Sequence, residues 1–91
     1  MKVSELLTSP AKWTHGTWAR DSKGFAVSVL DEKAVRFCLS GAILKCYPEK
    51  GAYEKIYHRI VQRVGMTPMQ WNDAPGRTFE EVRTLVLEMN L

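Results

Sequence analysis

A stretch of small and apolar residues, DEKAVRFCLSGAILKCY at positions 31–47, restricts most what this chain can fold into. Its small residues recur at steps of three, four or eight, which places them on one side of a helix, where another backbone can approach closely; they are Ala34, Cys38, Gly41, Ala42 and Cys46. Other apolar side chains cover most of the remaining circumference. Because a helix this apolar belongs inside a domain, we predict a buried central helix over 31–47, capped by Asp31 and stopped by Pro48.

Three later segments carry helix signals. In residues 52–64 the apolar side chains follow the i, i+3, i+4, i+7 pattern of an amphipathic helix, and Gly65 is suited to end it. The sequence TPMQW at 67–71 indicates a short turn with proline in its first position. Thr78 and Glu81 form a capping box for a last helix, whose apolar stripe is Phe79, Val82, Leu85, Val86 and Met89.

Ahead of the central helix, the sequence predicts one short helix and one β-hairpin. Ser4 is placed to cap the helix SELLTS, which Pro10 ends or follows with a new turn. Residues 17–21 and 25–29 predict two strands joined by the turn DSKG, and Phe25, Val27 and Val29 would then share one face. The expected fold class is therefore α+β, a single domain over residues 1–91 with three to four helices around a buried central helix and one β-hairpin.

Composition narrows the classes of function. Thirteen Lys and Arg against ten Asp and Glu give a net charge of +3, without any block of like charge, so a dedicated nucleic-acid surface is not indicated. The N-terminus lacks the apolar run of a signal peptide, and no stretch reaches the length of a membrane span. Together with two cysteines that are too far apart on one helix to form a disulfide, this indicates a cytoplasmic protein that does not enter a membrane.

No set of residues in the sequence points convincingly to catalysis or to a metal. Cys38 is the only nucleophile that His15 or His58 could activate, and the predicted helix places it about two turns from the N-terminus, among apolar neighbours. A zinc site would need these residues together with Cys46, yet no short Cys-x-x-Cys or His-x-His spacing is present. We therefore expect no catalytic residue, no metal ligand and no cofactor.

Three blocks of sequence carry a resemblance to a known family. They are WTHGTWARDSKG at 13–24, AVRFCLSGA at 34–42 and WNDAPGRT at 71–78. In these blocks the chain resembles a family of small bacterial and phage proteins of unknown function. The resemblance implies a small single domain and no activity that can be carried over. At the position of His15, members of that family often have glutamine or another polar residue, which counts against a mechanism that needs an imidazole there.

Polar side chains next to the tryptophans form the first candidate site. Loop and hairpin-end residues on a rigid scaffold often carry function, and tryptophan and arginine are common in binding hot spots. The alternative is structural: Asp73 accepts hydrogen bonds from Arg20 or from turn amides, and Trp71 closes the edge of the core. The candidate protein-binding residues are Trp13, Arg20, Asp21, Trp71, Asn72, Asp73 and Arg77.

A second candidate surface is the outer face of the predicted helix 52–64. Lys55, Arg59 and Arg63 are aligned four residues apart there and could contact phosphates. We expect a non-enzymatic protein-interaction module that binds another protein, encoded by a phage or mobile element and directed at a host factor. The alternative is a nucleic-acid-binding accessory protein that uses the basic row. Whether the protein is a monomer or a homodimer stays open.

Overall fold

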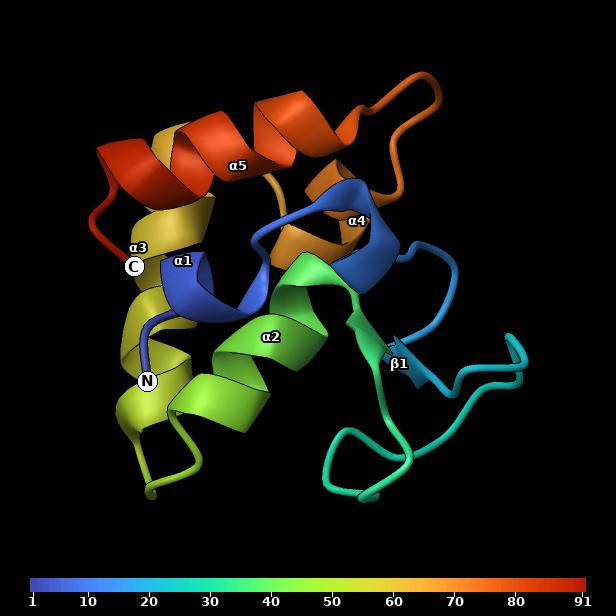
Figure 1. Ribbon diagram of the computed structural model, residues 1–91. Helices are drawn as coiled ribbons and strands as arrows, with labels where there is room; N and C mark the ends of the chain where they lie inside the picture. Colours follow the sequence, from blue (N-terminus) through green and yellow to red (C-terminus); the bar gives the residue numbers. More distant parts are fainter.

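The computed structural model describes residues 1–91 and confirms an α+β domain. Four helices surround the central helix α2 (Leu39–Cys46), and they are α1 (Val3–Leu6), α3 (Ala52–Val64), α4 (Pro68–Asn72) and α5 (Phe79–Glu88). A single 3-10 turn, η1 (Pro10–Lys12), precedes a two-stranded antiparallel sheet of β1 (Ala19–Arg20) and β2 (Arg36–Phe37). In Figure 1, α5 lies across the top and α3 along the left, while the chain between β1 and β2 projects as loops at the lower right.

The core is centred on the first turns of α2, as the small-residue pattern predicts. Leu39, Ala42 and Ile43 of this helix have no exposed surface. They pack in one cluster with apolar side chains from α1, α3 and α5, among them Val3, Ile60, Val82 and Val86. The two chain ends meet beside this cluster, because the Ser4 N–H donates to the Leu91 carbonyl oxygen at 3.2 Å. No helix is long and apolar enough to cross a membrane.

The predicted start of the central helix is wrong: α2 begins at Leu39, not at Asp31. Residues 31–35 form turns, and Arg36–Phe37 is a strand. The Asp31 carboxylate accepts the Lys33 N–H at 2.8 Å, which is a local turn rather than a helix cap. Long-range pairing outweighs the helical pattern here, since the Val35 N–H donates to the Arg20 carbonyl at 2.9 Å and the Cys38 N–H to the Trp18 carbonyl at 3.1 Å.

The predicted hairpin needs a related correction. Its turn is present, because the Gly24 N–H donates to the Asp21 carbonyl at 3.0 Å and Gly24 has a φ of 88°. However, β1 forms its ladder with β2, and residues 25–29 contribute only an isolated bridge between Arg20 and Ala26. Phe25 is 67% exposed whereas Val29 is buried, so these side chains do not share a buried face.

The helix signals in the second half of the chain are confirmed. Gly65 ends α3 in the left-handed conformation, with φ 77°. Thr67 caps α4, and Thr78 and Glu81 form the capping box of α5. At the N-terminus, α1 begins one residue before the predicted cap: Lys2 occupies the N-cap position, and Ser4 lies inside the helix.

Candidate functional site

A buried asparagine at the end of α4 joins three separate parts of the chain. Asn72 has no exposed surface. Its Oδ1 accepts the Trp13 Nε1–H at 2.7 Å and the Leu39 N–H at 3.1 Å, and its Nδ2 donates to the Thr14 carbonyl at 3.2 Å. All four hydrogen-bonding positions of the amide are filled once the bond to Asp73 is counted. We call this arrangement of Trp13, Thr14, Leu39 and Asn72 the Asn72 junction.

Asp73 extends the junction to the bend before β1. Its Oδ1 accepts the Gly16 N–H at 3.1 Å and the Asn72 Nδ2–H at 2.9 Å. The predicted hydrogen bond from a turn amide to Asp73 is therefore present, and the alternative donor, Arg20, is engaged elsewhere. The carboxylate is exposed, so its acceptor role is local and structural in this conformation.

Arg20 and Asp21 are likewise bonded within the chain. The Arg20 guanidinium donates to Thr14 Oγ1 at 2.8 Å, to the Gly24 carbonyl at 2.9 Å and to the His15 carbonyl at 3.3 Å. The Asp21 carboxylate accepts the Lys23 and Phe25 N–H groups, both at 2.9 Å. These two candidate residues therefore hold the turn between β1 and residue 25 in place.

Trp71 of α4 and Arg77 of the loop before α5 form a stacked pair. The Arg77 guanidinium carbon lies 4.0 Å from the Trp71 ring centroid, and its Nε donates to the Trp71 carbonyl at 2.8 Å. Arg77 also pairs with Glu81 at 3.3 Å. The hydrogen bond from the Thr78 backbone lowers the pKa of the Glu81 carboxyl, and the charge of Arg77 contributes less.

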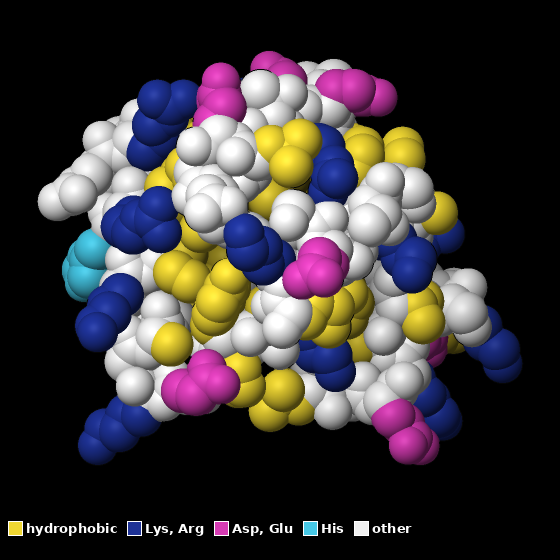
Figure 2. Space-filling model, turned by 60° about the vertical axis from the view of Figure 1, so that its left-hand side comes forward, with side chains coloured by type: hydrophobic (Ala, Val, Ile, Leu, Met, Phe, Trp, Pro, Cys, Tyr) yellow, Lys and Arg dark blue, Asp and Glu magenta, His cyan; other side chains and the backbone are white.

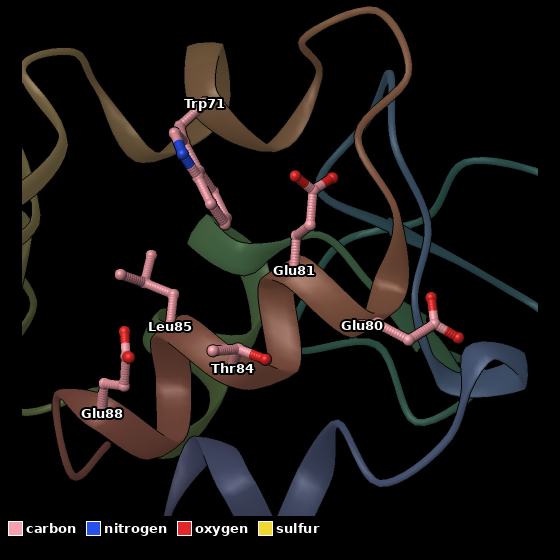
Figure 3. Close-up of a pocket in the computed structure, with 6 residues that line it drawn as sticks. All are labelled: Trp71, Glu80, Glu81, Thr84, Leu85 and Glu88. Atoms are coloured by element: carbon pink, nitrogen blue, oxygen red, sulfur yellow. The ribbon is translucent and has the colours of Figure 1, made fainter.

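An open hollow of about 320 Å³ separates Trp71 from α5. Figure 3 shows Trp71 extending from α4 toward α5, with the Glu80 side chain pointing away from it. Two of the three glutamates that line the hollow are neutralised, Glu81 by Arg77 and Glu88 by Arg63. The hollow therefore has little charge available for a ligand.

The basic row on α3 is largely engaged with α5. Arg59 donates to the Met89 carbonyl at 2.9 Å, and Arg63 pairs with Glu88 at 2.7 Å. Lys55 makes no ion pair. Figure 2 shows the side of the molecule that carries α3, where basic side chains are scattered among hydrophobic and uncharged ones. To contact phosphates, Arg59 and Arg63 would have to break these bonds to the C-terminal end of α5.

Cys38 lies at the N-cap of α2, so its predicted place two turns into a helix is wrong. Its Sγ accepts the Gly41 N–H at 3.2 Å, and the side chain has no exposed surface. Burial raises the pKa of the Cys38 thiol to about 11, despite the hydrogen bond from Gly41 that acts the other way. The thiol is thus protonated near neutral pH. No three His, Cys, Asp or Glu side chains come close enough to hold a metal ion.

Sequence reasoning missed several exposed apolar side chains on and next to the chain between β1 and β2. Trp18 is 40%, Phe25 67%, Leu30 66% and Val35 41% exposed, and these are four of the seven large apolar side chains exposed in the protein. Two of them, Trp18 and Leu30, line a groove of about 350 Å³ together with Thr17, Val27, Ser28, Val29 and Leu44. The uncharged run FAVSVL at 25–30 was the available signal, and the expected hairpin assigned it to the core.

Comparison with known proteins identifies a family but no activity. A model described as a family of unknown function (DUF6197) matches residues 2–89. No curated protein and no solved structure matches the chain.

Proposed function

The chain belongs to that family of unknown function, and on the basis of its surface we propose that it is a non-enzymatic protein-interaction module. The proposal rests on one observation: three large apolar side chains on the chain between β1 and β2, Phe25, Leu30 and Val35, are exposed, as is Trp18 just before β1. Large exposed apolar side chains beside a groove mark interaction sites more often than singly scattered ones do. Here two of the four, Trp18 and Leu30, line an apolar groove.

The location of the polar candidate residues also supports this choice of surface. Four of these residues use their side chains in hydrogen bonds between separate segments of the chain, and they are Trp13, Arg20, Asn72 and Asp73. They are therefore better suited to position the exposed loops than to contact a partner. The exposed chain starts and ends on this framework, because Arg20 and Asp21 hold its first turn and β2 holds its end. A partner would thus contact apolar side chains on a segment whose two ends are held in place by hydrogen bonds.

A protein from the host of a phage or mobile element is the partner class to look for first, since the sequence blocks resemble those of bacterial and phage proteins. The experiment is affinity capture from bacterial lysate with the tagged protein, with and without nuclease, followed by mass spectrometry. We expect a protein partner that nuclease does not remove.

The matched variants are Leu30→Glu in the proposed surface and Leu87→Glu on α5. Both leucines are exposed, at 66% and 54%, so both variants should fold with melting curves close to the parent. We expect Leu30→Glu to reduce capture at least about ten-fold and Leu87→Glu to leave it unchanged. Equal capture by both variants would overturn this surface. Material that disappears with nuclease would overturn the function itself and favour nucleic acid.

A further inference from the structure

A small cavity lies between the bend before β1 and the loop that joins α4 to α5. It measures about 140 Å³, and it is more enclosed than the hollow at Trp71 or the groove at Trp18. Its lining residues come from two segments far apart in the sequence, and they are His15, Asn72, Asp73, Ala74, Pro75, Gly76 and Arg77. A cavity of about 150 Å³ holds one six-membered ring. The space is therefore sized for a small planar group.

One oxygen of the Asp73 carboxylate is free to serve a ligand at this cavity. Its Oδ1 accepts the Gly16 N–H at 3.1 Å and the Asn72 Nδ2–H at 2.9 Å, which fixes the orientation of the side chain. Its Oδ2 accepts no hydrogen bond within the chain, and Asp73 forms no ion pair. The cavity is thus lined by one anionic acceptor in a fixed position.

The Arg77 guanidinium is also held by contacts that leave one of its groups unused. It stacks on Trp71 at 4.0 Å, its Nε donates to the Trp71 carbonyl, and its Nη1 donates to Glu81. Its Nη2 makes no hydrogen bond within the chain. Although Asp73 and Arg77 line one cavity, they form no ion pair with each other. The fold therefore keeps a hydrogen-bond acceptor and a hydrogen-bond donor separate on the wall of one cavity.

The charges around the cavity favour a neutral ligand. Glu81 balances the charge of Arg77, whereas Asp73 has no ion-pair partner. Asp73 would therefore repel a carboxylate or phosphate, and a cation would leave the Arg77 Nη2 donors without an acceptor. An amide group satisfies both side chains, because its N–H donates to a carboxylate and its carbonyl oxygen accepts from a guanidinium.

We propose that this cavity is a binding site for a planar amide, with Asp73 Oδ2 as the acceptor and Arg77 Nη2 as the donor. Both side chains are fixed before the ligand arrives, so binding costs little ordering of the protein. The inference goes beyond the proposed function, because the cavity shares no residue with the exposed apolar side chains or their groove.

The first test compares three ligands of one shape by NMR titration of the parent protein. Benzamide carries a donor and an acceptor, benzoate carries acceptors only, and benzamidine carries donors only. We expect benzamide to shift the amide signals of Gly16 and Gly76 and the Nε–H signal of Arg77, with a Kd of roughly 1–10 mM for a ligand of this size. Benzoate and benzamidine should bind at least about ten-fold more weakly, because each leaves one polar group of the site unpaired.

Three results would overturn the inference. The first is the absence of shifts at these three signals with benzamide. The second is binding of benzoate or benzamidine as tightly as benzamide, which would show that the cavity does not recognise a donor next to an acceptor. The third is a set of benzamide shifts confined to the groove at Trp18 and Leu30.

The second test changes the free carboxylate oxygen. Asp73→Asn keeps the size of the side chain and an oxygen for the Gly16 N–H, but it places an amino group where Oδ2 stood. We expect it to weaken benzamide binding at least about ten-fold. Glu32→Gln is the matched control, because it neutralises an exposed carboxylate that lines no cavity, and it should leave the Kd unchanged. Equal Kd values for both variants would contradict the role of Asp73, and the ligand series on the parent protein does not depend on either variant.

The natural amide has two possible sources, a side-chain carboxamide of a peptide and the ring amide of a nucleobase. Two matched pairs of probes separate them in the same titration: the peptides Gly-Gln-Gly and Gly-Glu-Gly, and uracil and 1,3-dimethyluracil, which has no N–H. The pair whose first member binds at least about ten-fold more tightly identifies the source. If neither pair differs, the cavity does not select an amide and the inference is overturned.

Discussion

Replacing Asn72 by alanine should remove a large part of the protein's stability. The substitution deletes the acceptor of the Leu39 N–H and of the Trp13 indole N–H, and it deletes the donor to the Thr14 carbonyl. Leu39 is fully buried and Thr14 nearly so, so water cannot readily replace the lost amide. The indole of Trp13 is partly exposed, so water can replace the lost acceptor there and the energetic cost should be smaller.

The size of the effect follows from these contacts. A buried polar group left without a partner costs about 1–3 kcal/mol. Two such groups at Leu39 and Thr14, with a smaller loss at Trp13, give about 3–5 kcal/mol. A domain of this length has about 5–14 kcal/mol in total, so Asn72→Ala should lose about a fifth of it or more. At roughly 4–8 °C per kcal/mol, the melting temperature should fall by at least about 12 °C.

Urea unfolding of the parent, Asn72→Ala and Asp73→Ala measures this directly. Asp73→Ala is the matched control because it changes the adjacent residue and removes bonds to Gly16 and Asn72 at an exposed position. Water can serve the exposed Gly16 N–H, and the buried Asn72 Nδ2 keeps its bond to the Thr14 carbonyl, so we expect a loss of about 1 kcal/mol. A loss below about 1 kcal/mol for Asn72→Ala, or equal losses for both variants, would refute the view that Asn72 joins the three segments.

Two further predictions concern α2. Gly41→Ala should lower the free energy of unfolding, measured in urea, by about 1–3 kcal/mol, because a Cβ there would lie 2.1 Å from the Trp18 carbonyl oxygen. The better helix propensity of alanine offsets only part of this loss. An unchanged unfolding midpoint would contradict the close approach of Gly41 and Trp18. Burial raises the pKa of Cys38 from 9.0 to about 11, so the folded state holds this proton more tightly than the unfolded state does. The contribution of Cys38 to stability should therefore be constant below pH 9 and be lost as pH rises from 9 through 11. Iodoacetamide at pH 8 should label Cys38 only after unfolding, whereas rapid labelling of the folded protein would show that this thiol is accessible.

The parts of the fold that could be predicted from the sequence depend on neighbours along the chain. The start of α5 is encoded by a capping box within four residues, and the end of α3 by Gly65. The error at residues 31–38 has the opposite origin. An aspartate side chain that accepts the N–H two residues later serves a turn as well as a helix start, so Asp31 did not distinguish them. The contacts that decided the outcome, from Arg20 and Trp18, come from far along the chain.

The candidate site was predicted in part for the same reason. Residues near the tryptophans were expected to come together, and Trp13 does meet Asn72. Within that group, the hydrogen bond from a turn amide to Asp73 was foreseen, whereas the full burial of Asn72 was not. An asparagine between loop-forming residues indicates a turn, and its burial depends on where α2 begins. That start was itself misplaced in the sequence prediction.

The Asn72 junction and residues 25–30 represent two kinds of sequence in this chain. Trp13, Leu39 and Asn72 come from the three blocks that carry the family resemblance, and they bond to one another in the interior. Residues 25–30 lie between the first two blocks and take no part in these bonds. Substitutions in residues 25–30 would therefore leave the bonds of the junction in place. For this reason we look for partner specificity in residues 25–30, and for stability in the junction that positions them.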